Sequence, residues 1–184
     1  MNETLQLICQ RRSVRDFQNK PVSRKLLEQV LQAGQLAPFA QCENRHFAAV
    51  EDKQLLADIR STCKQAVAAM GIPGLAEMAN DPGFDPLYGA RTLVVISGEE
   101  NTASPAIDCA AAAQNILIAA ESLGLHTCWM YYPLFLFHGA HADEMLQRLC
   151  IPQGYHPYAA VAIGYGKGAY PDMPQRDAGY IDYL

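Results

Sequence analysis

The sequence lacks a long hydrophobic run, an excess of basic residues and a signal peptide, and each absence excludes a class of protein. Its longest apolar stretch, residues 128–137, is interrupted by Pro133 and is too short to cross a membrane, which takes roughly 18 residues. The 14 lysines and arginines are outnumbered by 19 aspartates and glutamates, and the net charge of −5 argues against a nucleic-acid or anionic-membrane surface. Residues 1–4 carry neither the basic nor the apolar region of a signal peptide. We therefore expect a cytoplasmic protein that binds neither nucleic acid nor membranes.

Motifs for metal binding and for hydrolysis are also missing. The six cysteines lie at least 19 residues apart, without the close pairs of a zinc knuckle or a redox CxxC motif, so we expect free thiols and no metal site. Neither an HExxH motif nor a GxSxG elbow is present. The glycines at 164–168 follow an apolar run as in a dinucleotide-binding loop, but Pro171 and Pro174 leave no helix behind them to bind a pyrophosphate. Cys128 sits in an apolar stretch, where a buried structural thiol is more typical than a nucleophile.

Helical and extended patterns alternate along a chain of 184 residues, which is long enough for one domain with its own core, residues 1–184. Residues 108–123 are apolar nearly all round and predict a central buried helix that ends before Gly124. Residues 71–89 show no clear period and predict a long loop with at most a short helical piece. Further helices are expected near residues 5–9, 23–34, 53–70 and 142–149, and strands at 46–50, 92–97, 126–131 and 158–164. This order predicts an α+β or α/β protein of three layers, with the sheet in the middle.

A basic cluster, Arg11-Arg12-Ser13-Val14-Arg15, follows the first predicted helix of this acidic chain. Guanidinium groups and a hydroxyl at this density suit a phosphate, because arginine offers forked donors that match its oxygens. The other interpretation is a solvated helix end, where cations complement the dipole of the helix C-terminus. The cluster alone does not decide between the two.

Five segments in order resemble the FMN-dependent nitroreductase family. The resemblance covers essentially the whole chain. It implies an α+β fold with a mixed, mostly antiparallel central sheet between layers of helices. The matching segments are Arg11–Phe17, Leu36–Pro38 with Asn44–Phe47, Leu87–Val95, Asp108–Asn115 with Ala119–Met130, and Ala162–Tyr165 with Pro174–Arg176.

The resemblance also implies roles for particular residues. Arg11, Arg12 and Ser13 would bind the FMN phosphate and ribityl chain, and Arg15 would reach the pyrimidine edge of the flavin. Gln41 and Asn44 lie in the loop that family members contribute from the partner subunit. The segment Trp129, Met130 and Tyr131 would lie along the flavin, partly through its main chain, although plain core packing is an equal alternative for Trp129. Arg176 matches a basic residue that completes the phosphate site, and Lys167 is a weaker candidate for that role.

The chain departs from the family pattern at two places. The loop between Pro38 and Phe47 is one residue short and reads Gln41-Cys42-Glu43 where asparagine and glutamine are usual. Tyr131 and Tyr132 follow the strand after which relatives often carry glycines, and these rings would narrow the flavin face or restrict the substrate.

The implied activity is that of an oxidoreductase in which FMN takes electrons from NADH or NADPH and passes two of them to a nitroaromatic, a quinone or a similar small oxidant. No catalytic side chain is required, since the cofactor carries the chemistry and the protein orients it. Two alternatives remain open. One is a flavin-binding redox module without turnover, and the other is an interaction domain whose basic cluster binds an acidic partner.

The final segment, residues 165–184, contains four tyrosines, an isoleucine and a leucine without an amphipathic period. Aromatic side chains of this kind are enriched at interfaces, and family members are intertwined homodimers with two flavin sites at the subunit boundary. We therefore expect this arm to lie at the interface of a homodimer. The alternative is a tail that folds back on its own subunit.

Overall fold

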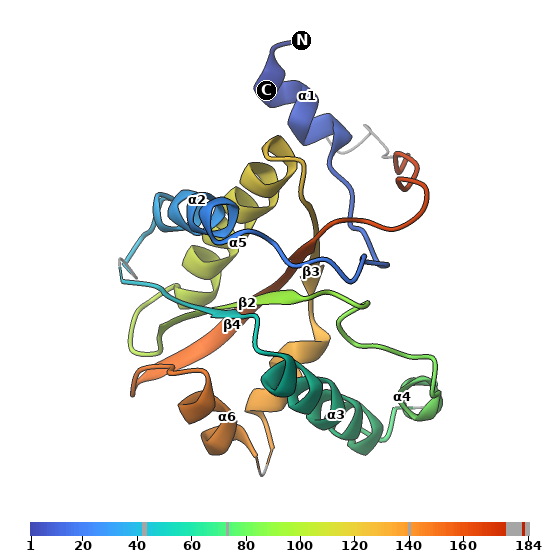
Figure 1. Ribbon diagram of the computed structural model, residues 1–184. Helices are drawn as coiled ribbons and strands as arrows, with labels where there is room; N and C mark the ends of the chain where they lie inside the picture. Colours follow the sequence, from blue (N-terminus) through green and yellow to red (C-terminus); the bar gives the residue numbers. More distant parts are fainter. Residues whose placement is uncertain (42–43, 73, 140, 176–181, 183–184) are drawn as a thin grey trace.

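The computed structural model describes residues 1–41, 44–72, 74–139, 141–175 and 182. A central sheet lies between two groups of helices, with α1 standing apart beside α5 (Figure 1). In chain order the elements are α1 (Glu3–Gln10), α2 (Arg24–Gln35), β1 (His46–Val50), α3 (Lys53–Ala69), α4 (Leu75–Asn80), β2 (Thr92–Glu99), α5 (Pro105–Ser122), β3 (His126–Met130), the 3₁₀ helix η1 (Tyr132–Phe137), α6 (Ala142–Arg148) and β4 (Tyr155–Gly164).

The sheet contains four strands in the order β1-β2-β4-β3, and each neighbouring pair runs antiparallel. A parallel element is added at the outer edge of β3, where Ser13 forms an isolated bridge with Thr127. The expected α+β class and mostly antiparallel central sheet are confirmed. The strand order also places β1 and β3 at opposite edges of the sheet.

Each face of the sheet packs against its own helices, because successive side chains of a strand point to opposite sides. In β2, Val94 and Ile96 pack with the buried residues of α2 and α5. Leu93 and Val95 join the other core, which is completed by α3, η1 and Met145 of α6. Figure 1 shows α2 and α5 on one side of the sheet and α3 and α6 on the other.

Three elements differ from the expected boundaries. Helix α5 begins at Pro105, three residues before the apolar pattern, because proline is well suited to the first helical position. Strand β4 begins at Tyr155 and passes Pro157 next to an irregularity in its register with β2. Residues 132–137 form the unexpected helix η1, whereas α4 supplies the short helical piece anticipated in the long loop. Among the described residues, no helix is long and apolar enough to span a bilayer.

Helices α2 and α5 approach each other closely at Gly34, which is buried. A Cβ atom added there would lie 2.9 Å from Cγ1 of Ile116 and 3.1 Å from Cε1 of Phe47. Ile116 is fully buried in the packed core, and the partly buried Phe47 packs against that core, so an added methyl group forces both side chains to shift.

We predict that Gly34→Ala lowers the free energy of unfolding by about 1–3 kcal/mol, because overpacking outweighs the gain in helix propensity of about 1 kcal/mol. Urea unfolding followed by circular dichroism measures the effect. Gln32→Ala on the exposed side of the same helix is the control and should leave stability within about 0.5 kcal/mol of wild type. A Gly34→Ala variant more stable than wild type would contradict this packing.

Candidate functional site

The segment that carries the basic cluster leaves α1 and runs along the outer edge of β3. The Val14 N–H donates to the Thr127 carbonyl at 3.0 Å, and the Phe17 N–H donates to the Tyr88 carbonyl at 3.0 Å. Phe17 also forms an antiparallel bridge with Gly166, while its side chain and that of Val14 are buried. The backbone of residues 13–17 is therefore fixed by pairing on both sides, and it caps the edge of the sheet.

The Arg12 side chain is used within the fold, where its guanidinium donates hydrogen bonds to main-chain carbonyls. Its Nη1 donates to the carbonyls of Cys9 at 2.6 Å and Gln10 at 2.8 Å at the end of α1, and its Nε donates to the Asp172 carbonyl at 3.2 Å. A guanidinium on the last carbonyls of a helix complements the helix dipole. The helix-end interpretation of the cluster therefore applies to the Arg12 side chain.

Arg11 and Arg15 instead lie near Cys128 of β3. Burial raises the pKa of the Cys128 thiol, and the charges of Arg15 and Arg11 both oppose that rise. None of the ion pairs found in the described part of the chain involves Arg11 or Arg15. Two guanidinium groups without a carboxylate partner thus form a local positive site on an acidic protein.

Tyr88, in the loop before β2, lies near Arg15. The pKa of its phenol is raised mainly by burial and then by Cys128 and Tyr132, whereas Arg15 lowers it through its charge and a side-chain hydrogen bond. The backbone of Tyr88 has a φ of 54°, a left-handed conformation that costs a bulky residue about 1–2 kcal/mol. Such a conformation persists only where the surroundings over-determine it.

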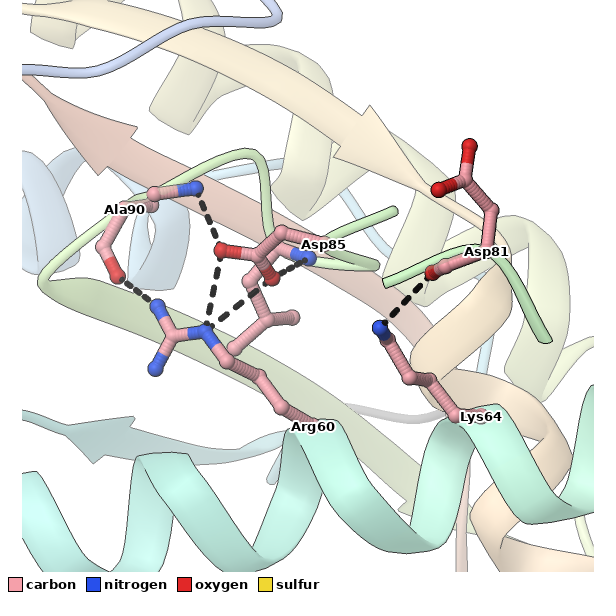
Figure 2. A network of polar contacts seen from close by, with 7 residues as sticks. Arg60, Lys64, Asp81, Asp85 and Ala90 are labelled. Atoms are coloured by element: carbon pink, nitrogen blue, oxygen red, sulfur yellow. Dashed lines mark hydrogen bonds and ion pairs between the residues drawn. The ribbon is translucent and has the colours of Figure 1, made fainter. Parts of the chain in front are cut away.

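A carboxylate and a guanidinium supply that constraint (Figure 2). Asp85 accepts hydrogen bonds from the N–H groups of Leu87 and Gly89, each at 2.8 Å, so its two oxygens hold the residues on either side of Tyr88. Arg60 of α3 donates from Nε to both Asp85 oxygens, at 3.0 and 3.1 Å, and from Nη2 to the Ala90 carbonyl at 2.6 Å. This Asp85 clamp fastens the loop to α3.

The end of β3 presents side chains alternately to the core and to the surface. Met130 is 2% exposed and belongs to the core, so its main chain is left for contact with a ligand. Trp129 is 40% exposed and Tyr131 is 69% exposed, with the Tyr131 ring edge-on to Phe135 at 5.1 Å between centroids. Plain core packing, the alternative for Trp129, does not describe a side chain with that exposure.

Gln41 and Asn44 lie at the other edge of the sheet, just before β1. The Gln41 N–H donates to the buried Asp108 carboxylate at 3.3 Å, and its side-chain oxygen accepts from the Ala103 N–H at 2.9 Å. Asn44 is exposed beside Arg45 and Phe47. Three strand spacings, about 14 Å in all, separate β1 from β3, so one chain does not bring these two residues to Arg11 and Arg15.

The described part of the C-terminal arm rests on its own subunit. The Tyr170 hydroxyl accepts from the Arg12 N–H at 2.8 Å and donates to Glu121 Oε1 at 2.8 Å. Burial, followed by the hydrogen bond to Glu121, raises the pKa of Tyr170 to about 12. Lys167, the weaker candidate for the phosphate site, forms an exposed ion pair with Asp16 at 3.6 Å. Arg176 lies outside the described residues.

Sequence reasoning missed Tyr88 and Asp85 as parts of the site. The run Asp85-Pro86-Leu87-Tyr88-Gly89 has the composition of a turn, and an aspartate at its start is a known turn signal. That signal predicts the turn but not its neighbours, which come from α3 and from residues 15–17. Within the described ranges, no group of three or more histidine, cysteine or acidic side chains gathers to hold a metal.

The model of the Nitroreductase family matches residues 8–165. The chain belongs to this family. Among solved structures, a nitroreductase with bound FMN from Bacteroides fragilis superposes on this nitroreductase-family chain with a TM-score of 0.93, at 32% identity and with 100% of both chains covered. A Methanothermobacter thermautotrophicus protein named as an NADH dehydrogenase/NAD(P)H nitroreductase is 28% identical over 89% of this chain and 77% of its own length. An FMN reductase [NAD(P)H] of Bacillus subtilis is 25% identical over 90% of this chain and 66% of its own length.

The cysteines of this nitroreductase-family chain should differ in their reactivity toward alkylating reagents, because some are exposed and others, including Cys128, are buried. Treatment with iodoacetamide at pH 8 should modify the exposed Cys9 and Cys150, whereas the buried Cys128 and Cys63 stay unmodified, because a raised pKa and burial both suppress the thiolate. Peptide mass mapping reads the result, and the same treatment in denaturant is the control, where all thiols should react. Preferential labelling of Cys128 in the native protein would contradict its assignment as a structural thiol.

Proposed function

We propose that this protein is an FMN-dependent oxidoreductase that uses NADH or NADPH to reduce a nitroaromatic, a quinone or a similar small oxidant by two electrons. The observation that carries the proposal is the pair Arg11 and Arg15, which have no carboxylate partner in the described chain and lie beside the accessible end of β3. Family membership supports it, as do relatives described as FMN-bound and as an NAD(P)H-dependent FMN reductase.

The residues present fit FMN in chemistry and in position. The cofactor has an anionic phosphate, a polar chain and a flat aromatic ring system. Arg11 and Ser13 supply a guanidinium and a hydroxyl for the first two, and the partly exposed Trp129 and Tyr131 supply an apolar surface for the third. We assign the pyrimidine edge to Arg15, and the remaining phosphate contact to Arg176.

FMN, when bound, supplies the hydride chemistry, and the chain's own residues bind and orient it. Arg15 places a fixed positive charge where negative charge develops on reduction. Arg12 acts indirectly, because its guanidinium donates to carbonyls at the end of α1 and its backbone N–H donates to the Tyr170 hydroxyl, which keeps Arg11 and Ser13 in place. The buried Met130 contributes its main chain.

We further propose a homodimer in which Gln41 and Asn44 reach the site of the partner subunit. Their position at the sheet edge opposite Arg11 and Arg15 supports this, because a partner chain would bring them to the flavin from the other side. Exposed apolar side chains lie near both halves of the site, at Leu36 and Phe39 and at Trp129 and Tyr131, as expected of an interface. In this proposal residues 1–184 form one FMN-binding domain and the arm 165–184 reaches the interface. Free thiols at the five described cysteines suit a cytoplasmic location.

An anaerobic titration tests the activity. The purified protein should be yellow with an FMN spectrum, NADH or NADPH should bleach it, and an added quinone or nitroaromatic should restore the colour. A colourless protein that does not take up added FMN would refute the proposal and favour an interaction domain. A yellow protein that neither nicotinamide bleaches would instead be a redox module without turnover.

Flavin affinity tests the assignment of the arginines. Arg11→Ala and Arg15→Ala should each weaken FMN binding about 10- to 150-fold, the equivalent of about 1.5–3 kcal/mol for a lost charge-assisted hydrogen bond. Quenching of FMN fluorescence measures the change. Arg24→Ala removes an exposed arginine at the start of α2 and serves as the control, with unchanged affinity expected. If both cluster variants bind like wild type, FMN lies elsewhere.

Assembly is a separate prediction. Light scattering of the FMN-loaded protein should give twice the chain mass of 20.2 kDa. Asn44→Ala should weaken FMN binding although Asn44 lies far from Arg11 in its own chain, because the partner's site loses a contact. Truncation after Gly168 should weaken both the dimer and the flavin, since what binds only the assembled form stabilises it. A monomer that retains FMN at micromolar concentration would refute the shared site.

A further inference from the structure

The backbone of Tyr88 is held by hydrogen bonds on both sides. The Asp85 clamp binds the N–H groups on both sides of it, and its own N–H donates to the Asp85 carbonyl at 3.0 Å. Its carbonyl accepts from the Phe17 N–H at 3.0 Å, two residues beyond Arg15. Tyr88 therefore connects α3, through Asp85 and Arg60, to the segment that carries Arg15.

This tight placement comes at the cost of a strained backbone. Tyr88 and Gly89 are both left-handed, with φ values of 54° and 79°. Glycine adopts that conformation freely, and a Cβ at position 89 would press on the Phe17 carbonyl at 3.3 Å. Tyrosine adopts the left-handed conformation only at an energetic cost, so a strained tyrosine beside a candidate site indicates a functional role for its side chain.

The surroundings of the Tyr88 ring indicate the role of its side chain. The Phe17 N–H bond to the Tyr88 carbonyl holds the Arg15 segment against Tyr88, and the charge and a side-chain hydrogen bond of Arg15 lower the pKa of the Tyr88 phenol against the larger effect of burial. None of the ion pairs in the described chain involves Arg15. Tyr88 and Tyr132 pack against the same core. Tyr132 lies edge-on to Phe84 at 5.5 Å between ring centroids, and its hydroxyl bonds Met78 Sδ at 3.7 Å. The flexible side chain of Arg15 therefore lies next to the hydroxyl of Tyr88, whose backbone position is fixed by the fold.

We propose that Tyr88 is a positioning residue that holds the Arg15 guanidinium toward the pyrimidine edge of the flavin, with the Asp85–Arg60 clamp fixing Tyr88 in turn. This rests on the proposed function, in which Arg15 contacts that edge. The hydroxyl acts on the cofactor only through Arg15. Its removal therefore matters when Arg15 is present and has no effect when Arg15 is absent.

A double-mutant cycle tests this dependence. Tyr88→Phe removes the hydroxyl and keeps the ring and the backbone. It should weaken FMN binding about 3- to 10-fold in the wild-type background, the range expected for one hydrogen bond, and less than 2-fold in the Arg15→Ala background. Tyr158→Phe is the control, because it removes a phenol hydroxyl on β4 beside the other core of the sheet, and it should show no coupling to Arg15.

The flavin midpoint potential supplies a readout that a merely structural role does not move. Tyr88→Phe should shift the potential to a more negative value, in the same direction as Arg15→Ala, because a misplaced guanidinium stabilises the reduced flavin less. Equal weakening of FMN binding by Tyr88→Phe in both backgrounds, or an unchanged potential, would overturn the positioning role while leaving the proposed function intact. A wild-type protein that fails to bind FMN would overturn both.

Discussion

Everything proposed for the site depends on how the backbone of residues 13–17 pairs with the rest of the fold. This segment bonds Thr127 on β3, Tyr88 before β2 and the residues after β4, so it is held by three parts of the chain that are distant in sequence. The pairing covers an exposed sheet edge, which a soluble protein must protect. It also places Arg11 and Arg15 beside the accessible end of the same strand. One stretch of backbone therefore both covers the sheet edge and positions the two arginines of the candidate binding surface.

Burial and exposure divide the cluster into different tasks. The Arg12 guanidinium donates to a carbonyl at the end of α1 and to the Asp172 carbonyl. Arg11 and Arg15 form no ion pair among the described residues, so their charges can bind an anionic ligand. Tyr170 ties the same helix end to Glu121 of α5, so the start of the arm and the start of the site share one hydroxyl. Loss of the Tyr170 contacts would therefore loosen both the start of the arm and the end of α1, because their hydrogen bonds form one connected network.

Much of this architecture could be predicted from sequence, for reasons that particular residues make clear. The apolar pattern of α5 and the β-branched run of β2 are strong signals, because α5 has seven buried residues and β2 is buried at every position except Glu99. The family resemblance pointed to the cluster as a whole. Sequence could not separate Arg12 from Arg15, since the difference lies in which carbonyls the fold brings near. The left-handed conformation of Tyr88 could not be predicted either, because the Asp85 turn around it is fastened by Arg60, 28 residues before Tyr88 on another element.

The separation of β1 from β3 has a genetic consequence. In a twofold dimer of the proposed kind, each site combines the Arg15 edge of one chain with the Asn44 edge of the other. A hybrid of an Arg15→Ala chain and an Asn44→Ala chain therefore concentrates both lesions in one site and leaves the second site whole. Two alleles that are each defective alone would complement each other when expressed together, with up to about half the sites restored in each hybrid dimer.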